Sequence, residues 1–333
     1  MSLSSYTKIR DLGKGTYGLV WLAEKNNELY VVKQVEITEK NTFLEIVMEK
    51  IALDRMKKDC FPYLLCLHDF FKSKNQVVFI FNYFPDFYSL EELILKEFEQ
   101  FDIFIRYVIM KNLLIGLHEI HSRKFVHKDI KSGNILLNPT TLLTTYIDFG
   151  MACFHQNVPC LNSFTGTPKY VAPELVKKEN ITFEIGKKID IWALGITFIE
   201  LCFGSGTVLE YLFIGTKSVN DVLNMIKDLD QETINGFLET LNKNDESNFY
   251  IEIIRPMLIV DWKKRTSTYQ ALTHLYDLSN RLINMTKPKD IPIKKDEAPE
   301  MIDKLALYMA KSFKIDKSVK ILSSERGLNK TIR

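Results

Sequence analysis

The sequence predicts an α+β fold with two lobes, a small β-rich lobe followed by a larger, mainly helical one. Three observations predict it. The first 80 or so residues form short segments rich in β-branched and aromatic residues. From Ser89 onward, long segments carry apolar residues at helical spacing. A chain of 333 residues, 46% of them hydrophobic, is long enough to build two cores.

The small lobe is expected to hold five strands and one helix. Short apolar runs separated by Gly or Asn-Asn predict the strands, and residues Leu44, Val47 and Ile51 recur on one helical face. The expected strands are Tyr6–Leu12, Leu19–Ala23, Leu29–Val35, Leu64–Phe71 and Gln76–Phe81, and the expected helix runs from Asn41 to Lys58.

The larger lobe is expected to be helical, with a turn-rich stretch from 125 to 185 that carries most of the polar motifs. Pro288 and Pro292 mark a linker, and Ala298–Phe313 has the pattern of an amphipathic helix. Helical periodicity covers 89–97, 101–122, 186–203, 218–226 and 231–242. We therefore divide the chain into a small lobe at 1–81, a hinge at 82–88, a large lobe at 89–280 and a basic tail at 281–333.

The charge balance gives no reason to expect nucleic acid as a partner. The formal net charge of the chain is +2, although the tail at 281–333 is basic. Few aromatic residues alternate with the charges of that tail, which is unlike a nucleic-acid-binding segment. Two interpretations of the tail stay open: a solvated, partly disordered end, or a segment that docks on an acidic partner.

The cysteines and the apolar segments predict an intracellular protein. An odd number of scattered cysteines without C-x-x-C or zinc-finger spacing suits reduced thiols. The chain opens on polar residues instead of a signal peptide, and apolar stretches such as Val77–Phe81 are too short to span a bilayer. The five cysteines are Cys60, Cys66, Cys153, Cys160 and Cys202.

Three glycines, Gly13, Gly15 and Gly18, lie between two expected strands. The G-x-G-x-x-G pattern also marks dinucleotide-binding folds, but there the glycines lie between a strand and a helix. Between two strands they suit a flexible hairpin that covers phosphate groups. An ordinary hairpin without a ligand is the alternative interpretation.

Lys33 lies near the end of an expected strand, fifteen residues after Gly18. Beneath the glycine hairpin its ammonium can neutralise phosphate oxygens, and it needs a carboxylate partner when no nucleotide is bound. Glu45 and Glu49 share a face of the next helix because they are four residues apart. We favour Glu49, since the apolar residues that follow it fit the packing of the helix, but Glu45 stays open.

Two polar motifs in the turn-rich stretch suit phosphoryl transfer. Asp129 supplies a carboxylate that can orient and deprotonate a hydroxyl, and Lys131 is a point charge that can stabilise a moving phosphoryl group. Asn134 and Asp148 offer one neutral and one anionic oxygen to Mg²⁺, a hard cation.

This set of motifs, in this order and spacing, resembles the eukaryotic protein kinase family. Gly166–Glu174 resembles the end of its activation segment, and Asp190–Gly195 resembles the start of the helix buried in its large lobe. Arg265 resembles the late arginine that pairs with Glu174. The resemblance covers roughly residues 6–276. It implies the two-lobed kinase fold and transfer of the γ-phosphoryl group of ATP, with Mg²⁺, to a protein hydroxyl.

The resemblance also implies a nucleotide site between the lobes. The adenine is expected against a hinge of Asn82, Tyr83 and Phe84, with Phe81 at the back of the pocket. Val20 and Val31 are expected as its apolar floor and roof. The implied catalytic residues are Asp129, Lys131, Asn134, Lys33 and Glu49, the implied magnesium ligands are Asn134 and Asp148, and the remaining nucleotide contacts are Gly13, Gly15, Gly18 and Lys33.

Two features resemble the serine/threonine branch of the family. Lys131 stands two residues after Asp129, and Gly-Thr-Pro-x-Tyr precedes Ala172. By the same resemblance, Thr167 is expected to bridge Asp129 and Lys131. Gly133 stands where many arginine-directed kinases have a glutamate, which weakens the case for substrates with an arginine before the target.

One departure from the family pattern concerns control. Lys128 stands where the family usually has an arginine before Asp129. A lysine keeps the charge but lacks the bidentate fork that suits phosphate. The resemblance places an activating phosphate at Ser163, three residues before Gly166, and because of Lys128 we expect it to activate only modestly.

Three other functions are alternatives to a serine/threonine kinase. A pseudokinase that acts as a scaffold would be expected to lack one of the polar motif residues, and none is lacking. A small-molecule kinase of related fold seldom has the Gly166–Glu174 segment. A nucleic-acid binder fused to a kinase would depend on the basic tail, whose composition does not favour it.

Overall fold

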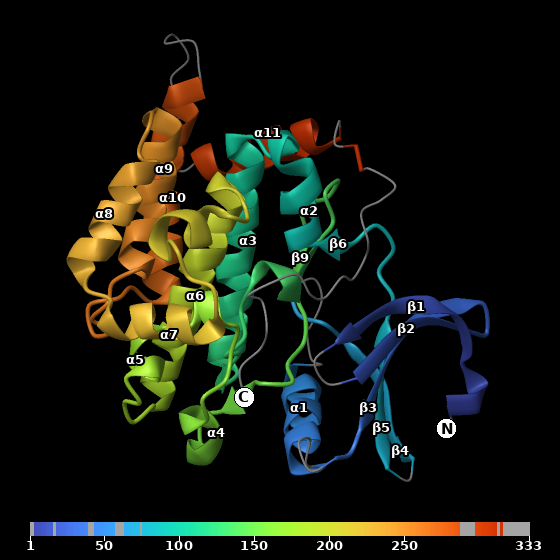
Figure 1. The fold of residues 1–333 in the computed structure, drawn as a ribbon. Helices are drawn as coiled ribbons and strands as arrows, with labels where there is room; N and C mark the ends of the chain where they lie inside the picture. The colour runs from blue at the N-terminus through green and yellow to red at the C-terminus, as the bar shows by residue number, and fades with distance from the viewer. Residues whose placement is uncertain are drawn as a thin grey trace.

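The computed structural model describes residues 3–15, 18–38, 43–56, 63–73, 75–286, 297–311 and 314–315. Figure 1 shows a lobe built on a β-sheet beside a larger body of helices. The two-lobed α+β fold expected from the sequence is therefore confirmed. The expected linker around Pro288 and Pro292 lies outside the described residues, as does the tail beyond residue 315.

The sheet of the small lobe has five antiparallel strands in the order β1-β2-β3-β5-β4. Successive side chains of a strand point to opposite faces. On β3, Val32 packs into an outer apolar cluster, whereas Val31 and Val35 pack toward the main core. Lys33 therefore lies on the inner face. The strands are β1 (Thr7–Gly15), β2 (Gly18–Lys25), β3 (Glu28–Glu36), β4 (Leu67–Ser73) and β5 (Gln76–Asn82).

Helix α1 (Phe43–Met56) lies between this sheet and the large lobe (Figure 1). Its residues Ile46, Leu53 and Met56 are buried in the main core. Glu49 is three residues after Ile46 and four before Leu53, so it shares their face. The helix thus carries a carboxylate into an apolar interface.

Two long helices, α3 (Ile103–Ser122) and α6 (Phe183–Phe203), form the centre of the large lobe. The side chains of Asp102 and Thr182 cap their first turns by accepting backbone N–H bonds. The other helices are α2 (Leu90–Glu97), α4 (Val158–Asn162), α5 (Pro173–Val176), α7 (Val219–Asp228), α8 (Gln231–Leu241), α9 (Asp245–Ile254), α10 (Thr268–Thr286) and α11 (Ala298–Ala310), with a π-helical turn at Val208–Leu212.

The turn-rich stretch folds into short strands and single helical turns around the polar motifs. β8 pairs with both β6 and β9, and β10 pairs with β7. These pairs fix the loops between them, which carry Asp129, Asn134 and Asp148. The strands are β6 (Tyr88–Ser89), β7 (Phe125–Val126), β8 (Ile135–Leu137), β9 (Thr144–Tyr146) and β10 (Cys153–Phe154).

Helices α9 and α10 were not expected from the sequence. Their outer faces carry many polar residues, which weakened the apolar signal, yet Leu275, Leu282 and Ile283 of α10 are buried in the main core. The helix continues to Thr286, so the expected boundary between the large lobe and the tail at 281 falls inside it.

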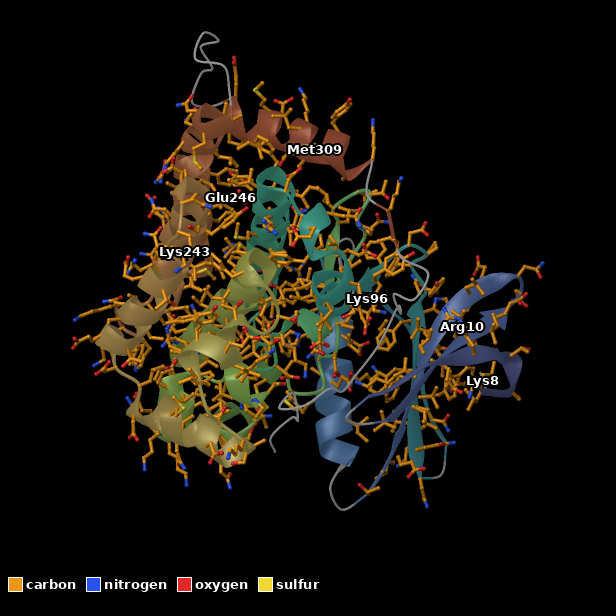
Figure 2. The ribbon with its side chains drawn as sticks, turned by 45° about the horizontal axis from the view of Figure 1, so that its top comes forward. Lys8, Arg10, Lys96, Lys243, Glu246 and Met309 are labelled. Atoms are coloured by element: carbon orange, nitrogen blue, oxygen red, sulfur yellow. A yellow bond between two sulfur atoms is a disulfide. The ribbon has the colours of Figure 1, made fainter. Side chains whose placement is uncertain are left out.

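Helix α11 lies within the expected helix 298–313 and packs across α3 and α10. Ala298, Ile302 and Ala306 are four residues apart and fully buried, and Lys111 of α3 forms an ion pair with Asp303. Figure 2 shows Met309 near the end of α11. This part of the tail is therefore folded against the large lobe.

The expectation of reduced cysteines is wrong for at least one pair. Cys153 of β10 and Cys160 of α4 form a disulfide across seven positions of sequence, and Cys66 is also disulfide-bonded. Cys202 is a buried free thiol. Sequence spacing could not reveal the bond, because the turn between β10 and α4 brings the two residues together. No helix in the described ranges is long and apolar enough to cross a membrane.

Candidate active site

The register of the sheet gathers several expected nucleotide contacts on its inner face. Val20 of β2 lies opposite Lys33, and Val31 lies opposite Phe81 of β5. Opposite residues of an antiparallel pair share a face, as do residues two apart in one strand. Phe79 stacks on Phe81 with parallel rings whose centroids are 6.2 Å apart. Apolar walls thus surround the Lys33 side chain.

The glycine hairpin joins β1 to β2. Gly13 lies opposite Val20, and Gly15 lies opposite Gly18; the two turn residues between them are outside the described ranges. A Cβ atom at Gly18 would lie 1.9 Å from the carbonyl oxygen of Gln34 on β3. Any other residue there would push the hairpin away from the strand that carries Lys33.

The expected hinge leads from β5 toward α2. Asn82 ends β5 and pairs with Tyr30, and the backbone N–H of Tyr83 donates to the carbonyl of Leu29 at 3.3 Å. Phe84 contacts the ring of Phe87, with centroids 5.6 Å apart. Because Tyr83 already uses its N–H, an adenine bound here would have to use other backbone groups of the hinge.

Lys33 contacts two carboxylates, one from each lobe. Its Nζ lies 2.7 Å from Oε1 of Glu49 and 2.8 Å from Oδ1 of Asp148, which is 115 residues further along the chain. Glu49, the favoured one of the two candidate glutamates, therefore contacts Lys33. The side chain of Glu45 lies outside the described part of the chain.

The charges in this cluster perturb one another. Burial alone lowers the pKa of Lys33, but the carboxylates of Asp148 and Glu49 outweigh burial and raise it. Burial raises the pKa of Glu49, against the opposing effect of Lys33. Burial also acts to raise the pKa of Asp148, but Lys33 outweighs it and the pKa falls. Asp148 therefore stays ionised and can bind a cation.

Asp129 is held at both of its carboxylate oxygens. Its Oδ1 accepts a hydrogen bond from the Thr167 hydroxyl at 2.8 Å, and its Oδ2 accepts one from the Asn134 amide at 2.9 Å. The ammonium of Lys131 lies 3.0 Å from Oδ2 and donates to Thr167 Oγ1 at 2.8 Å. Thr167 thus bridges Asp129 and Lys131, the arrangement expected from the resemblance.

The pairing of β8 with β9 brings Asn134 and Asp148 into the same region. The N–H of Ile147, next to Asp148, donates to the carbonyl of Asn134 at 3.0 Å. The Asn134 amide nitrogen is used on Asp129, which leaves its Oδ1 as the atom that can bind a cation.

The donor set at this site suits magnesium in company with phosphate. In the described part of the chain, no three His, Cys, Asp or Glu side chains gather that could hold a metal by themselves. One carboxylate and one amide oxygen are the hard ligands that Mg²⁺ accepts when phosphate oxygens complete its shell. Asp148 and Asn134 therefore fit a magnesium ion that arrives with a nucleotide.

Asp190 holds the backbone of the loop that carries Asp129, a role that the sequence did not reveal. Its carboxylate accepts the N–H of His127 at 2.8 Å and that of Lys128 at 2.9 Å, and it contacts His121 Nε2 at 2.9 Å. Its position in an apolar helix, where a buried carboxylate needs partners, was the available signal.

A second buried network lies beneath the Thr167 region. Glu200 of α6 forms an ion pair with Lys169 and accepts hydrogen bonds from Tyr170 at 2.7 Å and Ser132 at 2.8 Å. All four side chains are buried. The network fixes the segment after Thr167 to α6, and no motif in the sequence reveals it.

The end of the segment is fixed by a fully buried ion pair. Arg265 donates two hydrogen bonds to the Glu174 carboxylate, at 2.7 and 3.0 Å. The resemblance had implied this pair. The bidentate geometry is the strongest form of a charge-assisted contact.

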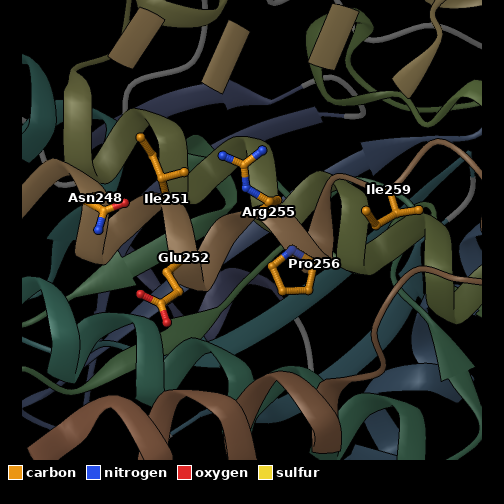
Figure 3. Close-up of a pocket in the computed structure, with 6 residues that line it drawn as sticks. All are labelled: Asn248, Ile251, Glu252, Arg255, Pro256 and Ile259. Carbon is orange, nitrogen blue, oxygen red and sulfur yellow. The ribbon is translucent and has the colours of Figure 1, made fainter. Parts of the chain in front are cut away.

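A hollow on the large lobe lies outside this site. Figure 3 shows its lining of Asn248, Ile251 and Glu252 from α9 and Arg255, Pro256 and Ile259 from the turn that follows. Glu252 pairs with Arg281 and Arg255 pairs with Glu239, so these charges hold helices together.

Comparison with known families bears directly on this site. The protein kinase domain matches residues 6–276. The chain belongs to the protein kinase family. Members of this family use ATP, typically with Mg²⁺, and a protein kinase domain implies a protein substrate.

Several similar curated proteins are named serine/threonine-protein kinases. Serine/threonine-protein kinase sid1 of Schizosaccharomyces pombe is 30% identical over 217 residues, 61% of this chain and 42% of that protein. Serine/threonine-protein kinase MAK of Homo sapiens is 28% identical over 298 residues, 82% of this chain and 45% of that protein. Probable serine/threonine-protein kinase fhkB of Dictyostelium discoideum is 26% identical over 297 residues, 86% of this chain.

The kinase described here spans less than half the length of these relatives, at 24%, 42% and 45% for fhkB, sid1 and MAK. What it shares with them is the domain. The domain is of the serine/threonine protein kinase type.

Proposed function

We propose that this kinase transfers the γ-phosphoryl group of ATP to serine or threonine hydroxyls of proteins, with Asp129 as the base. The observation that carries the proposal is the contact of Lys33 with both Glu49 and Asp148. It joins the strand beneath the glycine hairpin to the proposed metal ligand of the other lobe. Catalysis of phosphoryl transfer depends mainly on such positioning and on charge stabilisation.

The acceptor hydroxyl is assigned to Asp129. Thr167 and Asn134 hold its two oxygens, so the carboxylate cannot rotate freely, and a substrate hydroxyl within hydrogen-bond reach could give its proton to it. Lys131, 3.0 Å from the same carboxylate, is placed to stabilise charge on the phosphoryl group. Its position two residues after Asp129 supports a serine or threonine acceptor.

Magnesium is assigned to Asp148 and the Oδ1 atom of Asn134. When bound, the ion would neutralise charge on the phosphates. Lys33 would contact phosphate oxygens, since it lies beneath the glycine hairpin and keeps its positive charge. The adenine is assigned to the apolar face of Val20 and Val31, next to the hinge and in front of Phe81.

A pseudokinase scaffold is the alternative. It would bind ATP without efficient transfer. Against it stands the set of contacts around Asp129, which a protein that only binds nucleotide has no need to keep.

The test is transfer from ATP labelled at the γ-phosphate to casein or histone in the presence of Mg²⁺, followed by phosphoamino acid analysis. Wild type should label serine or threonine, and Asp129→Asn should lose about 10³-fold or more of the rate. Asp228→Asn, an exposed position on α7, is the matched control. A thermal shift with Mg²⁺ and ATP but no transfer by wild type would establish the scaffold instead.

A further inference from the structure

Lys128 occupies a constrained position directly before Asp129. Its φ angle is 66°, in the left-handed region that residues other than glycine rarely adopt, and its N–H is held by Asp190 at 2.9 Å. Such a conformation persists only where the surrounding structure enforces it. The Lys128 side chain leaves the loop toward the activation segment and is 5% exposed.

The ammonium of Lys128 binds the unmodified end of helix α4. It donates to the carbonyl oxygens of Cys160 at 2.7 Å, Ser163 at 2.8 Å and Leu161 at 3.2 Å. It also contacts the Ser163 hydroxyl oxygen at 3.0 Å. An ammonium has three N–H donors, so these acceptors saturate it. The last carbonyls of a helix carry partial negative charge that a cation stabilises.

Two further contacts hold the same short helix without any modification. The disulfide joins Cys160 to Cys153 of β10, and β10 pairs with Val126, two residues before Lys128. At the other side, the amide of Asn162 exchanges hydrogen bonds with the backbone of Ile181, at 2.9 and 3.2 Å. The segment is therefore fixed at two residues that closely precede Ser163.

Ser163 already belongs to this cluster as an unmodified residue. Its hydroxyl donates to the Cys160 carbonyl at 2.6 Å and accepts from Lys128. A phosphate at Ser163 would compete for an ammonium whose donors are in use. Four residues later, Thr167 holds Asp129 and Lys131.

We propose that Lys128 is a positioning residue that holds the activation segment in its working arrangement without phosphate. By binding the carbonyls of Cys160, Leu161 and Ser163, it keeps Thr167 against Asp129 in the unmodified enzyme. This inference rests on the proposed function, since the arrangement matters for phosphoryl transfer. The Lys128 ammonium binds backbone carbonyl oxygens in place of a phosphate.

The test compares wild type, Lys128→Met and Lys128→Arg as full chains treated with phosphatase, with intact mass used to verify that phosphate is absent. Dephosphorylated wild type should keep at least about a third of its kcat. Lys128→Met should lose about 30-fold or more in kcat while the KM for ATP changes less than about threefold, and Lys128→Arg should recover much of the loss. Lys178→Met is the matched control, because Lys178 is exposed and also has a positive φ, 54°.

Hydrogen exchange separates this inference from the proposed function. In Lys128→Met, amides of residues 158–167 should exchange at least about tenfold faster, with exchange in α3 and α6 unchanged. This result supports the positioning role even if wild type transfers no phosphate, which would refute only the proposed function. A loss of about 100-fold or more when wild type is dephosphorylated would overturn the inference. So would unchanged exchange and kcat in Lys128→Met.

Discussion

Two buried lysines hold different parts of this kinase together in different ways. Lys33 pairs with Glu49 of its own lobe and joins the lobes through Asp148, and these charges raise its pKa despite burial. Lys128 joins the loop of Asp129 to the activation segment through backbone carbonyls. Burial lowers its pKa to about 8, and Asp190 opposes that shift only in part. Carbonyl partners satisfy hydrogen bonds, whereas carboxylates also compensate the charge.

The largest loss of activity is expected at Asp148, one of the two carboxylates that pair with Lys33. Asp148→Asn removes both the proposed anionic magnesium ligand and one partner of Lys33, so transfer should fall by about 10³-fold or more while the fold is kept. Initial rates over a magnesium titration measure it, with circular dichroism to verify folding. Turnover near that of wild type at any magnesium concentration would show that Asp148 does not bind the metal.

A smaller loss is expected when the other carboxylate is neutralised. Glu49→Gln keeps a hydrogen bond to Lys33 but removes the charge from the buried face of α1, so kcat should fall by about 30- to 100-fold. Glu45→Gln is the control on the same helix and should change kcat less than about threefold. If the two variants ranked in the opposite order, Glu45 would be the working partner of Lys33.

The disulfide between Cys153 and Cys160, which anchors the activation segment, can be tested through the stability of the protein. Cys153→Ser with Cys160→Ser opens a loop of seven positions, which should lower the free energy of unfolding by about 2–3 kcal/mol in the chain-entropy description of disulfides. Urea unfolding without reductant measures it. The same unfolding curve for wild type and the double variant would mean that the bond does not form in solution.

The smallest effect concerns pH and has opposite signs for the two lysines. The usual pKa of a lysine is 10.5, so between pH 8 and 9.5 the unfolded chain holds a proton that folded Lys128 has lost. Stability therefore rises with pH in this window, on the order of 1–2 kcal/mol for one group. Lys33, whose pKa is raised, contributes stability that is complete below its usual pKa and is lost only above it.

The difference in unfolding free energy between wild type and Lys128→Met isolates the contribution of Lys128 to the pH dependence of stability. It should grow in favour of wild type from pH 8 to 9.5, while the kcat of wild type falls as the ammonium loses its proton. Parallel stability curves for the two proteins would show that the pKa of Lys128 is not lowered by burial.

The same comparison shows what the sequence could predict. The sequence predicts Lys33, Glu49, Asp129 and Asp148 because their residue types and spacing are set by local chemistry, and the structure brings Lys33 into contact with Glu49 and Asp148. The partners of Lys128 could not be found that way, since they are backbone carbonyls and any residue type supplies them.

Long-range contacts explain why the sequence did not predict the disulfide or the roles of Asp190 and Glu200. The bond between Cys153 and Cys160 depends on a turn whose path the spacing does not encode. Asp190 and Glu200 look like polar residues in an apolar helix until their partners from distant loops are known. The fold class was predictable because the apolar patterns of strands and helices can be read from the sequence without knowledge of those contacts.

Helix α10 has a practical consequence for any shortened form of this protein. The match to the kinase family ends at residue 276, in the middle of α10, yet Leu282 and Ile283 beyond it are buried, as are Ile302 and Ala306 of α11. A chain cut at residue 276 would expose the apolar side of α3 to water and would tend to aggregate during expression. The unit that folds is therefore longer than the stretch that matches the protein kinase domain.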